Sequence, residues 1–185
     1  TIARVLARFG QDPDDNPGRL QQWMFGSTRV VVDYAHNPEG LRSLLDALDA
    51  SRRGGRLGLL LGHAGNRQDE DLRAVAHVAA AYAPERVILK ELPGYARGRE
   101  ADSVPALMHA QLLADGLDPQ RVQLQPDEVQ AARSLLAWSS EGDLLVLPVH
   151  ELANRAQVVA LLDEMAALGW RAGAPVPEQA LDRVG

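Results

Sequence analysis

An acid, an imidazole and a helix-capping amide stand close together where a run of valines gives way to a new segment. The valines end at Val32, and Asp33, His36 and Asn37 follow, the last directly ahead of Pro38. Three consecutive valines are typical of a strand buried on both faces, while Asn37 is a favourable N-cap and Pro38 suits the first turn of a helix. The free N–H groups of such a turn favour an anion. His36 could donate to a phosphate there, and Asp33 could accept hydrogen bonds from ribose hydroxyls.

The same residues also have a purely structural interpretation. Asn37 and Pro38 would then only cap the helix, His36 would bond a backbone carbonyl, and Asp33 would close a turn. Residue spacing does not distinguish the two interpretations, so the structure must decide between them.

Polar side chains also follow three later apolar segments. The loop GHAGNR, which contains Arg67, follows one segment, Glu91 and a loop with Arg97 and Arg99 follow the next, and His150 follows the last. In an open parallel sheet, ligands bind beyond the carboxyl ends of the strands. We therefore expect these side chains to gather at one site. The alternatives are a surface ion pair for Arg67 and a solvated later loop whose arginines pair with neighbouring acids.

Hydrophobic periodicity predicts the elements that position these residues. Leu41, Leu44, Leu45 and Leu48 repeat at the spacing of one buried helix face. Helices are predicted over residues 2–9, 38–50, 69–82, 102–114, 127–138 and 152–168, and strands over 20–25, 29–34, 56–62, 86–91, 121–125 and 143–149. The first two strands could form a hairpin, and the later alternation of strands and helices indicates βαβ units.

This pattern predicts an α/β fold, with a mostly parallel sheet covered by helices on both faces. The length of 185 residues is enough for one domain with a sizeable core. We expect that single domain to span residues 1–171. Residues 172–185 contain little apolar material, so we expect them to form a flexible tail.

Composition argues against several classes of function. The net charge of −6 argues against a general nucleic-acid or anionic-membrane partner, and no apolar run approaches the ~20 residues of a membrane span. The chain has no cysteine, which excludes disulfides and thiolate metal sites and is compatible with the cytoplasm, where we expect the protein.

Two further features concern what the chain lacks. There is no GxxxxGK[ST] phosphate-binding loop, and the histidines show no metal-ligand spacing. The opening segment TIARVLARFG has helical periodicity without an initiator methionine. We therefore expect the chain to be part of a longer polypeptide.

The motif DYAHNP at residues 33–38, preceded by NPGRL at residues 16–20, resembles the C-terminal domain of the Mur ligase family. That family includes the peptidoglycan amino-acid ligases, folylpolyglutamate synthase and cyanophycin synthetase. The loops GHAGNRQDED and KELPGYARGRE are most similar to those of the cyanophycin synthetases. The resemblance runs from about Asn16 to Val149 and implies a Rossmann-like α/β domain.

The family forms amide bonds: ATP phosphorylates a carboxylate, and an incoming amine displaces the phosphate. The resemblance therefore implies ATP and Mg²⁺ as cofactors, with the Mg²⁺ held mainly by a central ATPase domain that this chain lacks. The implied partners are that upstream domain of the same polypeptide and an amino-acid or peptide substrate. Alone, the chain would be inactive.

The resemblance also implies a role for each candidate residue. Asp33 would contact the ATP ribose, His36 and Asn37 would line the phosphate side, and Arg67 would contact the nucleotide or the acyl-phosphate region. His36 and Arg67 are the candidate catalytic residues. The expected substrate-binding residues are Arg97 and Arg99, which would grip the carboxylate of the incoming amino acid, together with Glu91 and His150.

Three departures from the family pattern bear on which amino acid is added. Asn66 stands where an aspartate is usual, Leu92 replaces an acid, and LPVHEL keeps the His-Glu pair of the peptidoglycan ligases without their glycines and lysine. These departures motivate an alternative, in which a degenerate domain serves as a non-catalytic binding module. A third reading is an unrelated stand-alone α/β enzyme such as a methyltransferase.

Overall fold

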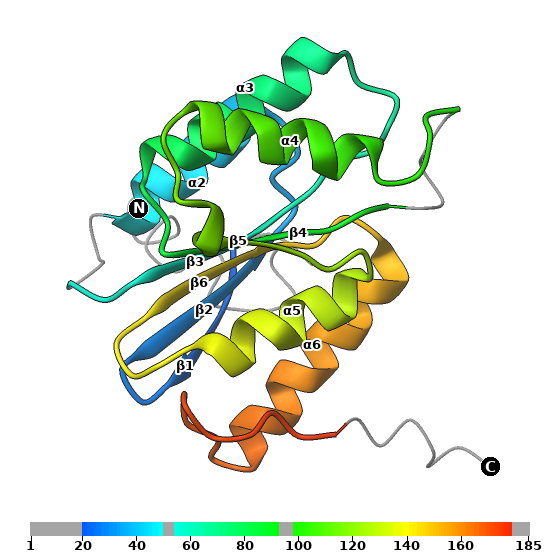
Figure 1. Cartoon of the computed structure of the whole chain (residues 1–185). Coiled ribbons are helices and arrows are strands. Elements are labelled where there is room, and N and C mark those ends of the chain that lie inside the picture. Colours follow the sequence, from blue (N-terminus) through cyan, green and yellow to red (C-terminus); the bar gives the residue numbers. More distant parts are fainter. Residues whose placement is uncertain (1–19, 50–53, 93–97, 179–185) are drawn as a thin grey trace, which may run out of the picture.

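The described part of the chain contains one six-stranded sheet in the order β1-β2-β6-β3-β4-β5 (Figure 1). The chain is described here from a computed structural model, over residues 20–49, 54–92 and 98–178. The strands are β1 (Gln21–Phe25), β2 (Thr28–Asp33), β3 (Leu57–Leu61), β4 (Arg86–Leu89), β5 (Val122–Leu124) and β6 (Leu144–Pro148). β1 and β2 pair antiparallel as a hairpin, and all other neighbouring strands pair parallel.

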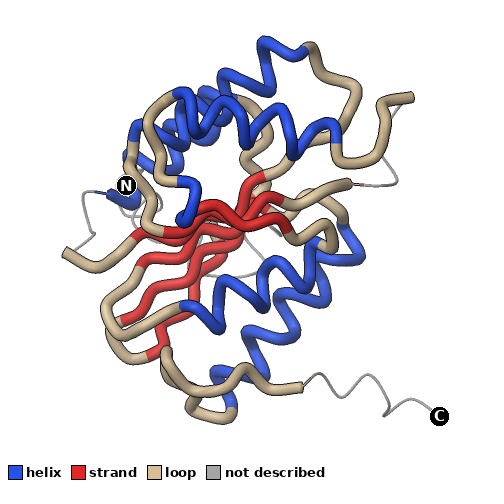
Figure 2. Tube along the Cα trace, in the orientation of Figure 1, coloured by secondary structure: helices blue, strands red, loops and turns tan. Residues whose placement is uncertain are grey.

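Helices cover both faces of this sheet (Figure 2). One face carries α2 (Pro38–Asp49), α3 (Asp69–Ala81) and α4 (Ser103–Ala114), and the other carries α5 (Glu128–Trp138) and α6 (Leu152–Ala167). A short 3₁₀ helix, η2 (Pro119–Arg121), leads into β5. The predicted α/β class and mostly parallel sheet are therefore confirmed, and the predicted strand over 86–91 ends earlier, at Leu89. The helix predicted over residues 2–9 lies outside the described residues.

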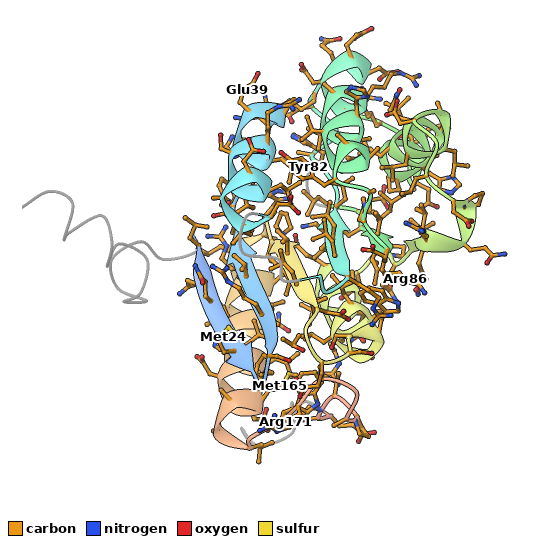
Figure 3. All side chains as sticks on the ribbon, turned by 90° about the vertical axis from the view of Figure 1, so that its left-hand side faces the viewer. Met24, Glu39, Tyr82, Arg86, Met165 and Arg171 are labelled. Atoms are coloured by element: carbon orange, nitrogen blue, oxygen red, sulfur yellow. The ribbon has the colours of Figure 1, made fainter. Side chains whose placement is uncertain are left out.

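Successive side chains along a strand point to opposite faces of the sheet, so the core is divided between the two faces. Val31 packs with the helices of the first face, whereas Val30 and Val32 pack with those of the second. All five residues of β3 are buried, as expected for a strand covered on both sides. Figure 3 shows α2 and α3 side by side, with Tyr82 at the end of α3. Its hydroxyl donates to Asp46 Oδ1 of α2 at 2.5 Å.

The segment after α6 is attached to the second face. Trp170 packs edge-on against Phe25 at 5.1 Å between ring centroids, and its Nε1 donates to the carbonyl oxygens of Ala174 and Pro175. Arg133 donates to the carbonyl of Pro177. These contacts involve the first part of the segment that was expected to form a tail. Residues 179–185 lie outside the described residues, and the domain boundary at residue 171 stays a prediction.

None of the helices in the described part of the chain is long and apolar enough to cross a membrane.

Candidate functional site

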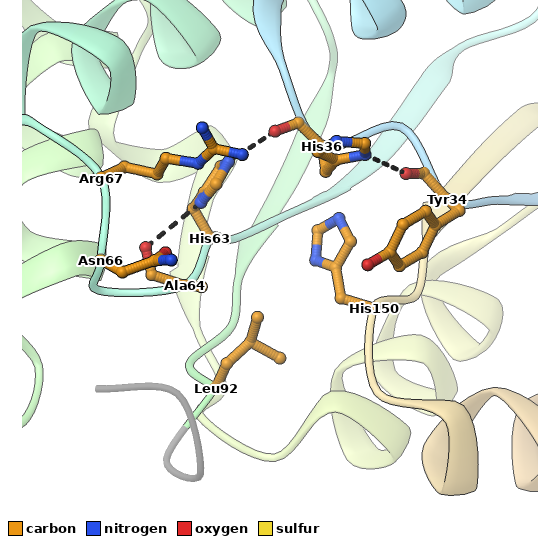
Figure 4. Close-up of a pocket in the computed structure, with 8 residues that line it drawn as sticks. All are labelled: Tyr34, His36, His63, Ala64, Asn66, Arg67, Leu92 and His150. Carbon is orange, nitrogen blue, oxygen red and sulfur yellow. Dashed lines mark hydrogen bonds between the residues drawn. The ribbon is translucent and has the colours of Figure 1, made fainter. Parts of the chain in front are cut away.

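The carboxyl ends of β2, β3, β4 and β6 converge on one cavity of about 250 Å³ (Figure 4). Its lining comes from four loops that are far apart in the sequence: Tyr34, His36, His63, Ala64, Asn66, Arg67, Leu92 and His150. No carboxylate is among these residues, and Arg67 is the one permanently charged side chain. The described lining therefore favours an anionic or neutral group over a cation.

His36 lines this cavity and also two neighbouring cavities. A second cavity of about 320 Å³ lies between the end of β2 and α2, and it includes Asp33. A third, of about 310 Å³, lies between the starts of α2 and α3 and includes Arg67. The loop from Tyr34 to Asn37 therefore forms a wall of all three spaces, and its conformation defines them.

The start of α2 is capped as the sequence predicts. Asn37 Oδ1 accepts a hydrogen bond from the backbone N–H of Gly40 at 2.7 Å. A Cβ atom on Gly40 would lie 2.9 Å from the same oxygen, so glycine allows the cap to approach this closely. Because Pro38 has no N–H and the N–H of Gly40 is bonded to Asn37, the N–H of Glu39 is the one left in the first turn for a ligand.

The carbonyl contact considered for His36 is present, whereas Asp33 bonds across the open end of the β1–β2 hairpin and does not close a turn there. Asp33 Oδ2 accepts from the backbone N–H of Leu20 at 2.9 Å, and His36 Nδ1 lies 3.1 Å from the carbonyl oxygen of Tyr34. A carbonyl oxygen can only accept, so His36 Nδ1 carries the hydrogen. These contacts leave Asp33 Oδ1 and His36 Nε2 for a ligand. The structural and functional interpretations are thus compatible, and the proposed roles stay predictions.

The side chain of Arg99, which follows β4 in the sequence, contacts the loop that follows β3. Its Nε donates to the carbonyl of Gly65 at 2.9 Å, and its Nη2 donates to the carbonyl of Arg67 and to Asp69 Oδ1, both at 2.7 Å. Arg99 therefore holds the loop that carries Arg67, whose own side chain is exposed and lines two of the cavities. The predicted contact of Arg99 with a substrate carboxylate stays a prediction. Arg97 lies outside the described residues.

Glu91 holds the start of α4. Its Oε1 accepts from the backbone N–H of Asp102 at 2.8 Å, where Asp102 has the left-handed φ of 62°. A left-handed N-cap is uncommon for a residue with a side chain, and the hydrogen bond that the Asp102 N–H donates to Glu91 stabilises it. The predicted contact of Glu91 with substrate stays a prediction.

Beneath the cavity lies a buried ion pair that the sequence analysis did not identify. Lys90 and Glu128 are 0 % and 2 % exposed, and Lys90 Nζ donates to Glu128 Oε1. Nζ also donates to the carbonyl of Pro148 at 2.6 Å and lies 3.3 Å from His150 Nδ1. A Cβ on Gly62 would lie 2.6 Å from Lys90 Cγ, so glycine is required beside this side chain.

Glu128 joins three elements at this point. It is the first residue of α5, and it also accepts from the backbone N–H groups of His150 and Glu151 and from Asn154 Nδ2. Burial lowers the pKa of Lys90 to about 8, and the attraction of Glu128 opposes that shift. Lys90 is therefore still mostly protonated at pH 7. The one sequence feature that indicates this buried ion pair is that Lys90 directly follows an apolar strand.

His63 is the second residue that sequence reasoning missed. It is 6 % exposed, and its Nε2 lies 2.6 Å from the carbonyl oxygen of His36. Burial lowers the pKa of His63 and lowers that of His150 well below its ordinary value, with the charge of Lys90 adding to the effect on His150. Both rings are therefore neutral at pH 7. Among the described residues, no group of three histidine or carboxylate side chains could hold a metal ion.

Comparison with known sequences identifies relatives. The family model described as "Mur ligase, glutamate ligase domain" matches residues 18–148. A cyanophycin synthetase from Crocosphaera subtropica is 32 % identical over 153 residues, which is 79 % of this chain and 16 % of that protein. A UDP-N-acetylmuramoyl-L-alanyl-D-glutamate–2,6-diaminopimelate ligase from Acidovorax sp. is 33 % identical over 134 residues, 71 % of this chain and 25 % of that protein. The chain thus spans a quarter or less of the length of these two curated relatives.

Solved structures show the same fold. A UDP-N-acetylmuramoyl-L-alanyl-D-glutamate–2,6-diaminopimelate ligase superposes with a TM-score of 0.58 and 22 % identity, covering 82 % of this chain and 32 % of that one. The E. coli protein FolC in complex with ADP also gives a TM-score of 0.58, at 20 % identity, covering 82 % of this chain and 33 % of that one. At these identities the similarity establishes the fold alone.

Proposed function

Because this chain belongs to the Mur ligase family, through the domain that the family model describes, we propose that it contacts the nucleotide and the amino acid in an ATP-dependent ligase that forms amide bonds. The ligase would be cyanophycin-synthetase-like and would act through an acyl-phosphate. The ATPase domain would precede this chain in the same polypeptide. The observation that carries the proposal is the cavity at four strand ends, where the DYAHNP loop and Arg67 meet beside the start of α2.

The residues around this cavity suit a phosphate-bearing ligand. In the first turn of α2 the N–H of Glu39 is left for a ligand, because Pro38 has no N–H and Gly40 donates to Asn37. His36 Nε2 is also left, and Arg67 supplies a positive charge. Asp33 Oδ1 is available to accept from a ribose hydroxyl. Bound ATP would supply the phosphoryl group that activates the carboxylate. On the family resemblance, we propose that Mg²⁺ is held mainly by the ATPase domain.

The proposal is tested by ADP release from the longer polypeptide. We expect release that requires both a carboxylate acceptor and an amino acid, and we expect none from the 185-residue chain alone, because it lacks a phosphate-binding loop. A screen of the proteinogenic amino acids, with amide product followed by mass spectrometry, would identify the substrate. Binding of nucleotide without any amide product would instead support the non-catalytic binding module.

Two alanine variants of the longer polypeptide distinguish a nucleotide site from a plain helix cap. Asp33→Ala should raise the KM for ATP about tenfold with kcat little changed, because a ribose contact is equal in ground and transition states. His36→Ala should lower kcat about tenfold, because charge develops on the phosphates during transfer. Steady-state kinetics measures both effects.

Glu70→Ala is a suitable control for these two variants. Glu70 is an exposed acid in the first turn of α3, and it lines none of the three cavities. Wild-type kinetics in all three variants would show that the DYAHNP corner is only structural.

A further inference from the structure

Two histidines, the buried His63 and the half-buried His150, hold successive carbonyl groups of the loop between β2 and α2. His150 Nε2 lies 2.9 Å from the carbonyl oxygen of Ala35, and His63 Nε2 lies 2.6 Å from that of His36. The two side chains come from the ends of different strands, β6 and β3, and approach the loop together, with 6.2 Å between their ring centroids (Figure 4). Because a carbonyl oxygen only accepts, each Nε2 must carry a hydrogen.

The tautomer of His150 is set by the buried ion pair. Lys90 Nζ lies 3.3 Å from His150 Nδ1, and an ammonium group has only donors. Nδ1 must therefore accept, which leaves the single hydrogen of the neutral ring on Nε2. Glu128 and the carbonyl of Pro148 hold Lys90 in this position. A continuous series of contacts thus runs from Glu128 through Lys90 and His150 to the carbonyl of Ala35.

The tautomer of His63 follows from its two contacts. Its Nδ1 lies 3.2 Å from the carbonyl of Ala64, and its Nε2 lies 2.6 Å from that of His36. A neutral ring has one hydrogen, and the much shorter contact requires it. Burial keeps the ring neutral. His63 and His150 therefore present the same tautomer to neighbouring peptide groups.

We infer that His63 and His150 are positioning residues of the candidate site, and that Lys90 positions His150. By fixing the peptide groups at Ala35 and His36, the two histidines hold the imidazole of His36 toward the cavities and keep the start of α2 in place. The inference about geometry stands on the contacts alone. Its consequence for the reaction rates rests on the proposed function.

The geometric part is tested by NMR on this chain labelled with ¹⁵N-histidine. At pH 7.5, the ring nitrogens of His63 and His150 should both show the neutral form with hydrogen on Nε2. Lys90→Met should change the ring signals of His150 and leave those of His63 as they are, because only His150 contacts the lysine. A hydrogen on Nδ1, or a doubly protonated ring, in either wild-type histidine would overturn the inference.

The functional part compares alanine and glutamine variants of the longer polypeptide. His63→Ala and His150→Ala should each lower kcat for amide formation about tenfold, the loss expected for one hydrogen bond. His63→Gln and His150→Gln should stay within about twofold of wild type, because the glutamine amide can donate to the same carbonyl. His109→Ala is the control, since His109 lies on α4 and lines none of the three cavities.

The outcomes separate this inference from the proposed function. Equal losses in the alanine and glutamine variants, or no loss in either, would overturn the positioning role. If the wild-type polypeptide forms no amide with any amino acid, the proposed function fails, and the NMR measurement still decides the geometric part.

Discussion

Lys90→Met is expected to lower the free energy of unfolding by about 3–5 kcal/mol, the usual result when one partner of a buried ion pair is removed. Methionine retains much of the volume of the lysine stem, so the loss comes mainly from the charge. Glu128 would keep its hydrogen bonds from His150, Glu151 and Asn154, but its carboxylate would have no buried cation beside it. Urea denaturation at pH 7.5, followed by circular dichroism, measures the change.

A double variant tests the cause of this loss. Lys90→Met combined with Glu128→Gln removes both charges, so the pair of substitutions should destabilise the protein less than Lys90→Met alone. The control is Arg171→Met, because Arg171 and Glu141 form an exposed ion pair with side chains that are 70 % and 46 % exposed. That substitution should change stability by less than about 1 kcal/mol. A loss for Lys90→Met no larger than for Arg171→Met would contradict a stabilising role for the buried pair.

Acidification below pH 6.5 is expected to destabilise the protein through His63 and His150. Both histidines have a folded-state pKa below the ordinary value of 6.5, so below that pH the unfolded chain binds more protons than the folded one. Stability must then fall as the pH falls. Each histidine contributes up to about 1.4 kcal/mol per pH unit, between its folded-state pKa and 6.5. The wider range belongs to His150, whose pKa is lowered further.

Urea midpoints at pH 7.5, 6.5 and 5.5 measure this dependence. His150→Gln should reduce its slope, because glutamine does not titrate, and His63→Gln should reduce it by less. An identical slope in wild type and His150→Gln would show that His150 is not the source of the pH dependence.

The elements of this fold were predictable because each carries its own local pattern. The four leucines of α2 repeat at helical spacing, and all four are buried. The residues of β3 are apolar throughout and buried on both faces. Turn chemistry at Gly26, with its left-handed φ of 66°, favours the hairpin of β1 and β2. These signals lie within a few residues of one another, so the sequence alone reveals them.

The contacts within the site were not predictable in the same way. Sequence position shows that Lys90 and His150 each follow a strand, but only the strand order brings them together. Because β6 lies between β2 and β3, His150 reaches both the loop at Ala35 and the lysine after β4. Glu128 resembles an ordinary acid in the first turn of a helix, which favours the positive helix end, and no local pattern indicates that it is buried.

The candidate residues fall into two groups, those that line the cavities and those that contact neighbouring loops and helices. Asp33, His36 and Arg67 line cavities at the strand ends, and their roles in a functional site stay predictions. Arg99 and Glu91 contact neighbouring loops and helix starts, interactions that depend on how the chain folds back after β4. The family resemblance implies ligand contacts for both, and these stay predictions. Charge and spacing reveal that an arginine can bind a carboxylate, but they do not reveal which carboxylate it meets.

The central place of β6 has a consequence for how the chain reaches its native state. This strand is the last of the sheet in sequence, yet β2 and β3 both pair with it. During synthesis, a nascent chain that has not yet extended past residue 142 therefore exposes two apolar strand edges with no partner between them. Such edges invite pairing with other chains, and contacts between distant segments form slowly. Pairing at the centre of the sheet must therefore wait until residues 144–148 have left the ribosome, and until then the two open strand edges make the nascent chain prone to aggregation.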